Sequence, residues 1–217
     1  LHKAQVQLDG ERLRTPRLET RSRLVQDGVE ALKPPGIIMG REFRNMNKGE
    51  LRMLRYSDLF RYTGRNASQP RIRLQMYLTS PGYRYSYKMR RCRYLYEKKT
   101  LVGRVLLRIA AMRLEALGRK FGIEIPFTCD IGEGFYIGHY GCIIVSHQTK
   151  IGKNCNISHD VTIGIKQRGE HKGCPVIGDN VYIAPGARII GGIRVGNNVA
   201  VGANCVVVDD VPDNAVV

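Results

Sequence analysis

The second half of the chain contains, at residues 177–207, the stretch IGDNVYIAPGARIIGGIRVGNNVAVGANCVV. Its aliphatic residues recur every six positions, and two shorter runs upstream share this period. The positions on the period are Ile131, Ile137, Ile143, Ile151, Ile157, Ile163, Ile177, Ile183, Ile189, Val195, Val201 and Val207. A helix repeats its apolar face about every 3.6 residues and a strand about every 2 residues, so a period of six predicts a solenoid of very short strands.

Two interruptions divide this pattern into turns. Ile151 follows Ile143 by eight positions, and Ile177 follows Ile163 by fourteen. Each gap comes after a third hexapeptide, so three hexapeptides form one triangular coil. The four predicted coils begin at Ile131, Ile151, Ile177 and Val195. Their inward residues would stack roughly 4.8 Å apart, and stacked coils would bury a face that one coil alone cannot.

A glycine follows the inward aliphatic residue in many of the hexapeptides. These glycines are Gly132, Gly138, Gly152, Gly164, Gly178, Gly196 and Gly202. We expect them at corners of the coil, where the chain bends sharply and a positive φ would favour glycine.

The basic charge lies in the first half of the chain. Residues 1–120 contain 28 Lys and Arg against 10 Asp and Glu, a net charge of +18, whereas residues 121–217 carry −2, which gives the overall +16. A basic segment of this kind is typical of contacts with nucleic acid, an anionic membrane surface or a phosphate-bearing ligand. A solvated basic face is an equally good interpretation.

The six cysteines show no CxxC spacing, which argues against a zinc ribbon and favours reduced, packed thiols in a cytoplasmic protein. The most apolar helical stretch, Leu101 to Leu117, contains three arginines, so no membrane span is predicted. No apolar signal sequence opens the chain. Because the chain starts without Met, we expect a fragment or an extended gene prediction, with Met39 and Met46 as candidate starts.

Three regions are expected. Residues 1–45 are charged and interrupted by proline, and we expect them to be disordered or a non-native extension. Residues 46–122 form a basic helical region, and residues 123–217 form the repeat domain. The expected helical stretches are Tyr56 to Tyr62, Ile72 to Leu78, Tyr83 to Lys98 and Leu101 to Lys120. Pro81 after a serine predicts a helix start, and Gly118 and Gly122 predict helix stops.

The segment Tyr83 to Arg91 is rich in tyrosine and arginine. Such a segment could form a membrane-surface or nucleic-acid patch. Tyrosines at helical spacing more often pack in a core, and we favour that interpretation.

Two histidines occupy equivalent places in successive coils. His139 follows Ile137 by two positions and His159 follows Ile157 by two, so the two side chains should lie roughly 5 Å apart along the axis. Packing in a solenoid does not require histidine, and imidazole is suited to proton transfer near neutral pH.

Residues 123–217 resemble serine acetyltransferase and related hexapeptide acetyltransferases that act on polysaccharides. The stretches that carry the resemblance are IGEGFYIGH at 131–139, DVTIG at 160–164, IGDNVYIAPGA at 177–187 and VGAN at 201–204. The resemblance implies a mainly β fold, a left-handed parallel β-helix of about four coils preceded by a small α-helical region. It also implies a homotrimer or a dimer of trimers.

The implied activity is transfer of an acetyl group from acetyl-CoA, the co-substrate, to the hydroxyl of a small acceptor, most directly serine in cysteine biosynthesis. In the family, a His at the place of His139 takes the hydroxyl proton, and an acidic residue fifteen positions earlier, here Glu124, orients it. Acetyl-CoA lies in a groove between subunits in that family. The matching positions here are Ala184, Pro185, Gly202 and Ala203.

Two departures from the serine-specific enzymes are visible. Those enzymes have an Asp before the catalytic His, where this chain has Gly138, and a second His before a proline, where this chain has Cys174. His171, three residues before Cys174, is a candidate substitute. These departures keep a sugar hydroxyl in a surface polysaccharide open as the acceptor.

Two other classes compete with acetyl transfer. A hexapeptide carbonic anhydrase would hold zinc with three His, including a pair five residues apart. His139, His147, His159 and His171 are spaced by eight, twelve and twelve, so no metal is predicted. A structural or adaptor solenoid would need none of these histidines. The block of basic residues could then recruit partners, with membrane-surface contact kept open and nucleic-acid binding not expected.

Overall fold

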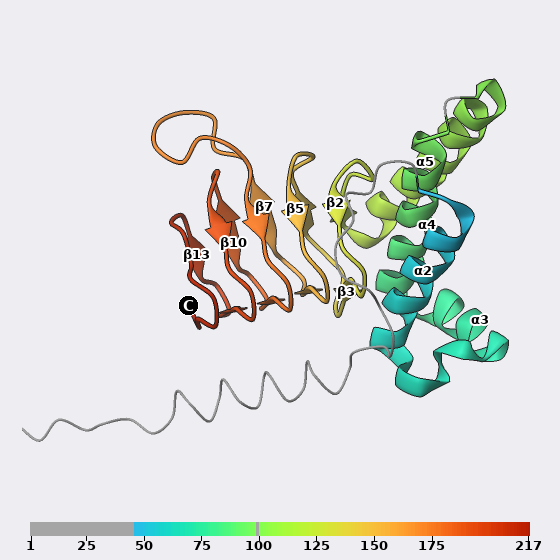
Figure 1. The fold of residues 1–217 in the computed structure, drawn as a ribbon, viewed down its shortest axis with the longest axis horizontal. Helices are drawn as coiled ribbons and strands as arrows, with labels where there is room; N and C mark the ends of the chain where they lie inside the picture. The colour runs from blue at the N-terminus through green and yellow to red at the C-terminus, as the bar shows by residue number, and fades with distance from the viewer. Residues whose placement is uncertain (1–45, 99) are drawn as a thin grey trace, which may run out of the picture.

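The computed structural model describes residues 46–98 and 100–217, so the expectation for residues 1–45 lies outside the described part. Within it, helices pack at one end of a prism of short strands (Figure 1). The helices are α2 (Lys48–Thr63), α3 (Pro70–Thr79), α4 (Pro81–Tyr96) and α5 (Leu101–Phe121), and a 3₁₀ helix η1 (Gly64–Ser68) joins the first two.

Three parallel sheets form the sides of the prism. Sheet A contains β1 (Ile123–Glu124), β4 (Ile143–Val145), β7 (Thr162–Gly164), β10 (Arg188–Ile190) and β13 (Val206–Val207). Sheet B contains β2 (Asp130–Ile131), β5 (Lys150–Ile151), β8 (Val176–Ile177) and β11 (Arg194–Val195). Sheet C contains β3 (Tyr136–Ile137), β6 (Asn156–Ile157), β9 (Tyr182–Ile183) and β12 (Ala200–Val201). The chain visits B, C and A in turn, which confirms three hexapeptides per coil.

The strand register confirms the four predicted coils and extends them at both ends. Before the first coil, β1 pairs with β4 and sets Ile123 against Ile143. After the fourth, Val211 forms a bridge with Val195. The aliphatic residues on the six-residue period are almost fully buried, so they form one continuous core along the axis.

The expectation that the repeat glycines need positive φ is wrong. None of the seven is in the left-handed region, and close approach of the next coil explains Gly132, Gly152, Gly178 and Gly196 instead. A Cβ built on Gly132 would lie 2.6 Å from the carbonyl carbon of Gly152, and a Cβ on Gly152 would lie 2.5 Å from the carbonyl oxygen of Gly178. Most of the non-glycine residues with a positive φ are asparagines. Their side-chain amides are hydrogen-bonded from coil to coil in the order Asn154, Asn180, Asn198, Asn214.

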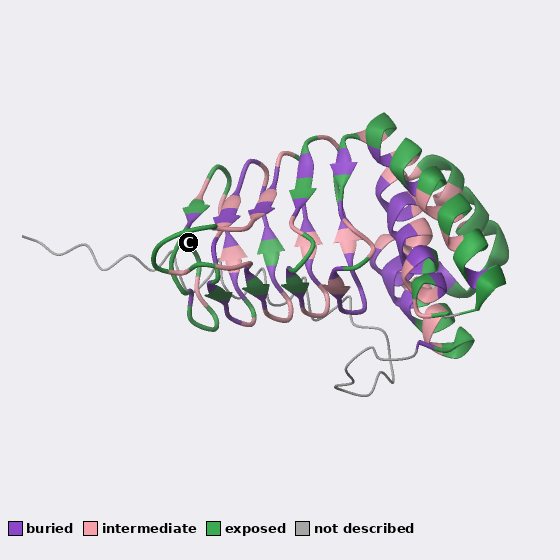
Figure 2. Cartoon of the chain, turned by 90° about the horizontal axis from the view of Figure 1, so that it is seen from above, coloured by how far each residue is buried: buried purple, intermediate pink, exposed green. Residues whose placement is uncertain are grey.

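The helical stretches form where the sequence predicts them, except that α2 begins at Lys48, eight residues before the predicted Tyr56. Ser80 caps α4 by accepting from the N–H of Tyr83, and Pro81 is its first residue. Gly122 ends α5 in the left-handed conformation at φ 63°. The predicted stop at Gly118 is wrong, because Gly118 lies within α5 and a Cβ there would lie 2.6 Å from the carbonyl oxygen of Ile123. The helices are buried on the side toward the coils and exposed on the side away from them (Figure 2).

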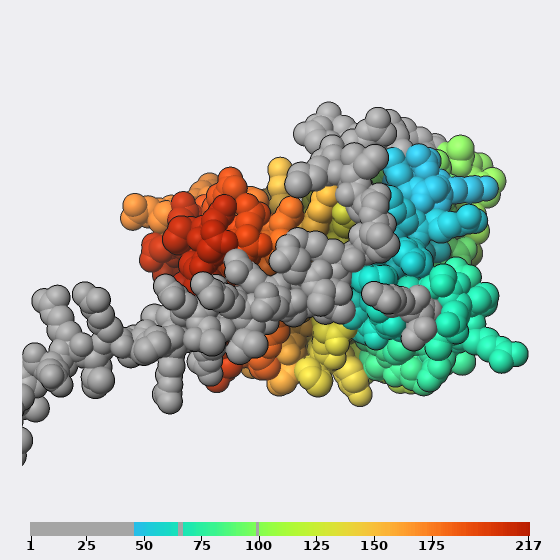
Figure 3. Space-filling model, turned by 60° about the horizontal axis from the view of Figure 1, so that its bottom comes forward, coloured from blue at the N-terminus to red at the C-terminus, as the bar shows by residue number. Residues whose placement is uncertain are grey.

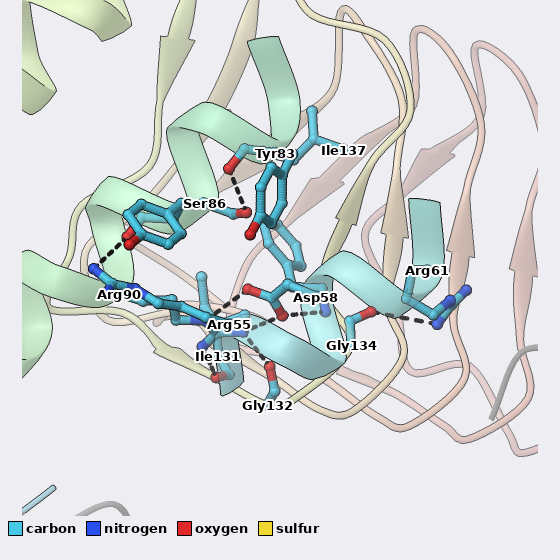
Figure 4. A network of polar contacts seen from close by, with 12 residues as sticks. Arg55, Asp58, Arg61, Tyr83, Ser86, Arg90, Ile131, Gly132, Gly134 and Ile137 are labelled. Atoms are coloured by element: carbon cyan, nitrogen blue, oxygen red, sulfur yellow. Dashed lines mark hydrogen bonds and ion pairs between the residues drawn. The ribbon is translucent and has the colours of Figure 1, made fainter. Parts of the chain in front are cut away.

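The helices cap the open edge of the first coil. Arg90 forms a two-pronged ion pair with Asp58, with both N–O distances 3.0 Å, and donates to the carbonyl oxygens of Ile131 and Gly132 (Figure 4). Asp58 also accepts from the N–H of Phe135 at 2.9 Å. These side chains take the place of a preceding coil, because the backbone groups at a sheet edge need partners.

The tyrosine-rich segment of α4 belongs to the core. Tyr83, Tyr85 and Met89 are at most 3% exposed. The hydroxyl of Tyr85 donates to the carbonyl oxygen of Ile125 and accepts from its N–H, at 3.0 and 3.1 Å. The core interpretation of this segment is therefore confirmed. No helix in the described ranges is long and apolar enough to span a membrane.

Candidate active site

One corner of the prism gathers most of the predicted site residues. We call it corner CA, because it connects sheet C to sheet A, and it comprises residues 138–142, 158–161, 184–187 and 202–205. Register between β3, β6, β9 and β12 stacks the positions that follow each strand. The stacked positions, from the first coil to the fourth, are His139, His159, Pro185 and Ala203.

Backbone hydrogen bonds hold this corner together along the axis. The N–H of Asp160 donates to Gly141, that of Gly186 to His159, and that of Asn204 to Pro185, at 2.8, 3.2 and 2.9 Å. The corner is therefore a rigid edge that displays one side chain per coil.

His139 and His159 are neighbours on this edge. Their ring centroids are 5.8 Å apart and the rings are nearly perpendicular, at 88°. Both residues are exposed, so either ring can meet a molecule in solution. The expected spacing of roughly 5 Å is confirmed.

The four positions matched to acetyl-CoA lie farther along the same edge. Ala184 is buried, Pro185 and Gly202 are half-buried and Ala203 is exposed. The side chains at these four positions are small, which fits a thin, extended ligand arm. The N–H of Gly202 donates to the carbonyl oxygen of Val217, and a Cβ at Gly202 would lie 3.1 Å from the same oxygen.

Glu124 lies on sheet A rather than at the corner. Its Cα is paired with that of Ile144, its side chain is exposed, and it forms no hydrogen bond or ion pair with any described residue. It lines a groove of about 720 Å³ between α5 and the first strands of sheet A. Cys142, three residues after His139, lines the same groove, so the groove extends from Glu124 to corner CA.

His171 is at the opposite edge of sheet A. It lies in the loop 165–174, which is closed by a bridge between Lys166 and Gly173. Its carbonyl oxygen accepts from the N–H of Gly192, and its Nε2 is 3.6 Å from Oδ1 of Asp209. Within one chain, His171 and His139 thus lie at opposite edges of sheet A. Cys174 lies at the same edge as His171.

An ion pair that sequence reasoning missed supports corner CA. Arg188 on β10 pairs with the carboxylate of Asp160 at 2.9 Å and donates to the carbonyl oxygens of Asp160 and Gly186. Asp160 directly follows His159, and Gly186 directly follows Pro185. Arg188 therefore ties the second and third coils together at this edge. Arg and Asp at these places give no signal in the sequence, because the period of six marks only inward residues.

In the part of the chain that the structure describes, no three His, Cys, Asp or Glu side chains are grouped in a way that could hold a metal ion. All six cysteines are described and none forms a disulfide. Cys92, Cys129 and Cys155 are buried, whereas Cys142 is exposed. Only some of the thiols are therefore packed in the core.

Comparison with known proteins agrees with this arrangement. The family described as bacterial transferase hexapeptide (six repeats) matches residues 174–209. Serine acetyltransferase of Staphylococcus aureus is 38% identical over 110 residues, which cover 50% of this chain and 52% of that protein. Serine acetyltransferase of Staphylococcus epidermidis is 40% identical over 105 residues, which cover 48% and 49%. The chain thus spans about half the length of the curated relatives it matches.

Solved structures extend the similarity to the helices. Soybean serine acetyltransferase, as the apoenzyme, superimposes with a TM-score of 0.64 at 29% identity, covering 78% of this chain and 66% of that chain. Serine acetyltransferase isoform 3 of Entamoeba histolytica, in complex with cysteine, gives a TM-score of 0.60 at 25% identity, covering 93% and 70%.

The fold and the repeat pattern define a hexapeptide-repeat protein with a left-handed parallel β-helix, preceded by helices. Within that class, the chain is similar to serine acetyltransferases, over about half of its length in sequence and over most of its length in structure.

Proposed function

We propose that the protein is an acetyl-CoA-dependent O-acetyltransferase, and most directly a serine O-acetyltransferase that makes O-acetylserine for cysteine biosynthesis. The observation that carries this proposal is corner CA, where His139 begins an edge that continues to Pro185 and Ala203. An exposed imidazole at one end of a smooth, narrow edge suits a reaction between a small hydroxyl and a long thioester. We take serine as the acceptor because the similar proteins are named serine acetyltransferases.

In this reaction His139 acts as general base. Its free ring nitrogen takes the proton of the acceptor hydroxyl while the oxygen attacks the thioester carbonyl carbon. The carbon–sulfur bond then breaks, and the thiolate of CoA takes the proton back from the imidazolium. Acetyl-CoA supplies the activated acetyl group. Ala184, Pro185, Gly202 and Ala203 would hold its extended arm.

Glu124 is proposed to orient His139 and to stabilise the imidazolium. Within one chain no hydrogen bond or ion pair joins these two side chains, and the groove that Glu124 lines leads from sheet A toward Cys142. A carboxylate in this role fixes the tautomer of the imidazole.

We propose a homotrimer, or a dimer of trimers, in which neighbouring chains share the active groove. Sheet A supports this because its outer face carries the exposed apolar side chains Ile144 and Val206, 46% and 64% exposed. A neighbour packed near this face could bring its own His171 toward His139, which one chain holds at opposite edges. Sedimentation of the full chain should give a trimer or a multiple of it, and a stable, active monomer would exclude the shared groove.

The acceptor could instead be a sugar hydroxyl in a surface polysaccharide. Gly138 is exposed beside His139, and Cys174 is remote from it, so two groups of the serine-specific enzymes are absent from this site. Loss of these groups weakens the case for serine more than the case for acetyl transfer.

We propose two regions in the chain, the basic helical region 46–122 and the repeat domain 123–217. We also propose that the reaction takes place in the cytoplasm, where the unpaired thiols would stay reduced.

A peripheral contact of α5 with an anionic membrane is supported by exposed apolar residues flanked by Arg104 and Arg108. These exposed residues are Leu101, Val102, Val105, Leu106, Ile109 and Met112.

The test is release of free thiol from acetyl-CoA by the full chain, first with L-serine and then with a panel of hexoses and N-acetylhexosamines. Serine-dependent release supports serine O-acetyltransferase. Release that is faster with a sugar supports the polysaccharide alternative. No acceptor-dependent release with any of these compounds contradicts acetyl transfer.

A further inference from the structure

A second concave site lies in the helical region, away from corner CA. It is a groove of about 640 Å³ enclosed by α2, the end of η1, α3 and α4. Figure 3 shows α2 and α3 side by side at the end of the molecule opposite the last coil. The lining residues include Lys48, Arg52, Arg55, Arg73, Met53, Tyr56, Tyr83 and Tyr87. A volume of this size is typical of small-ligand sites, which span about 300–1,000 Å³.

The charge of the groove is of one sign. Of the described residues that line it, four are cationic and none is Asp or Glu. Glu50, the nearest acidic residue in sequence, is engaged in the capping box of α2, where it accepts from the N–H of Asn47. Asp58 also lies within electrostatic reach of Tyr83, but it is fully buried and paired with Arg90, so the charge that the groove presents to a ligand is positive. A cleft lined by one sign of charge attracts the opposite charge.

Arg55 is the most constrained of these cations. Its guanidinium carbon lies 3.7 Å from the centroid of the Tyr87 ring, and its Nη2 donates to the carbonyl oxygen of Tyr87 at 3.1 Å. Its Nε is buried and has no hydrogen-bond partner among the described residues. Burial lowers the pKa of this guanidinium from its ordinary value, although it stays charged. Its stacking on Tyr87 therefore holds a positive charge at the wall of the groove.

The other wall of the groove is aromatic. Tyr83 is 2% exposed, and burial raises its pKa to about 12, so its hydroxyl stays neutral. Arg55 and Arg73 both oppose that rise, which means that both guanidinium groups lie within electrostatic reach of the Tyr83 ring. Met53 and Tyr56 are exposed at the rim and add apolar surface.

We propose that this groove binds a phosphate-bearing small molecule with an aromatic or apolar body. The phosphate would accept hydrogen bonds from the exposed guanidinium groups of Arg52 and Arg73, since planar guanidinium groups match phosphate oxygens well. The body of the ligand would lie against the tyrosines and Met53. The site is independent of the acetyl-transfer reaction, because none of its residues belongs to corner CA.

Calorimetric titration of the full chain with phenyl phosphate and with inorganic pyrophosphate tests this proposal. The variant R52Q/R73Q removes two exposed guanidinium groups and should weaken binding about tenfold or more, the usual effect of losing charged hydrogen bonds. R55K keeps the charge but removes the planar guanidinium that stacks on Tyr87 in the wall of the groove, and should also weaken binding. The matched control is R71Q/K150Q, which removes two exposed cations that do not line the groove and should change the affinity less than twofold.

Two further arms separate the alternatives. Saturating CoA should not displace phenyl phosphate, and displacement would assign the binding to the acetyl-CoA edge. The second arm measures binding of the chain to vesicles of phosphatidylglycerol. If the wild-type chain binds the vesicles, R52Q/R73Q does not, and neither chain binds the soluble phosphates, the ligand of the groove is a lipid headgroup and not a small molecule. Absence of binding at about 1 mM of either soluble phosphate, or equal loss in the control variant, would overturn the site.

Discussion

The hydroxyl of Tyr62 on α2 donates to the carbonyl oxygen of Ile137 and accepts from the N–H of the same residue, both at 3.0 Å. A single side chain thus pairs with both the N–H and the C=O of Ile137 at the edge of β3 that no other strand covers. Because Ile137 lies two residues before His139, this contact also fixes the start of corner CA.

Replacing Tyr62 by Phe should destabilise the protein. The ring would remain, but the N–H and C=O of Ile137 would be left buried without a partner, which costs about 1–3 kcal/mol. Urea denaturation measures the change in the free energy of unfolding. Tyr140→Phe is the matched control, because the side chain of Tyr140 is exposed and its hydroxyl makes no hydrogen bond with a described residue. Equal stability of the two variants would show that the helices do not cap β3 through this hydroxyl.

Arg90→Met should be more damaging, and its effect should depend on pH. Burial raises the pKa of the Asp58 carboxyl, while Arg90 and the N–H of Phe135 oppose that rise. Without Arg90 the folded-state pKa rises further. A carboxyl whose pKa is raised in the folded state destabilises the protein as the pH rises through that pKa. The loss of unfolding free energy in Arg90→Met should therefore be about 3–5 kcal/mol near pH 8 and shrink toward pH 5.

Arg119→Met is the control for this experiment. Arg119 pairs with Glu115 on the surface, where both side chains are largely exposed, so its loss should cost about 0.5 kcal/mol or less at either pH. An Arg90→Met deficit that grows as the pH falls would contradict a buried, charge-dependent contact with Asp58.

The cysteines should differ sharply in reactivity. Burial raises the pKa of Cys92 to about 11 and of Cys129 and Cys155 to about 12, so these thiols remain protonated at neutral pH. Cys142 is exposed at corner CA. Iodoacetamide near pH 8 should label Cys142 first, and mass spectrometry of the folded chain identifies the site. Labelling of Cys155 as fast as Cys142 would show that the coils open readily.

Much of this fold could be predicted from residues that face inward. The period of six marks Ile137 and Ile157 because burial leaves little choice of side chain, and it therefore places His139 and His159 correctly two positions later. The role of the glycines was predicted wrongly, because close packing of Gly132 on Gly152 and a positive φ give the same residue preference. Contacts between distant segments, such as Arg188 with Asp160, follow no period and could not be predicted.

Restoring an acidic residue at position 138 should improve the use of serine. Gly138 is exposed, and a Cβ there would approach only the Tyr136 ring, at 3.1 Å, so Gly138→Asp should fold. The serine-specific enzymes have Asp at this place, and a charged contact to the substrate should lower KM about tenfold with little change in kcat. Steady-state kinetics with Gly138→Ala as the control measures this. A wild-type chain that already saturates at low serine would contradict the prediction.

The central claim is that His139 is the general base, and kcat of His139→Ala tests it most directly. The ring is exposed, so its removal opens no core cavity, and sedimentation and calorimetry should give an unchanged oligomer and unchanged CoA binding. General-base catalysis is worth about 10²–10⁴-fold, so kcat should fall by at least about 100-fold. His159→Ala, which removes the neighbouring ring 5.8 Å away, should cost far less, and Glu124→Gln should fall between the two. If His139→Ala retains more than about a tenth of the wild-type kcat, His139 is not the base and the account fails at its central residue.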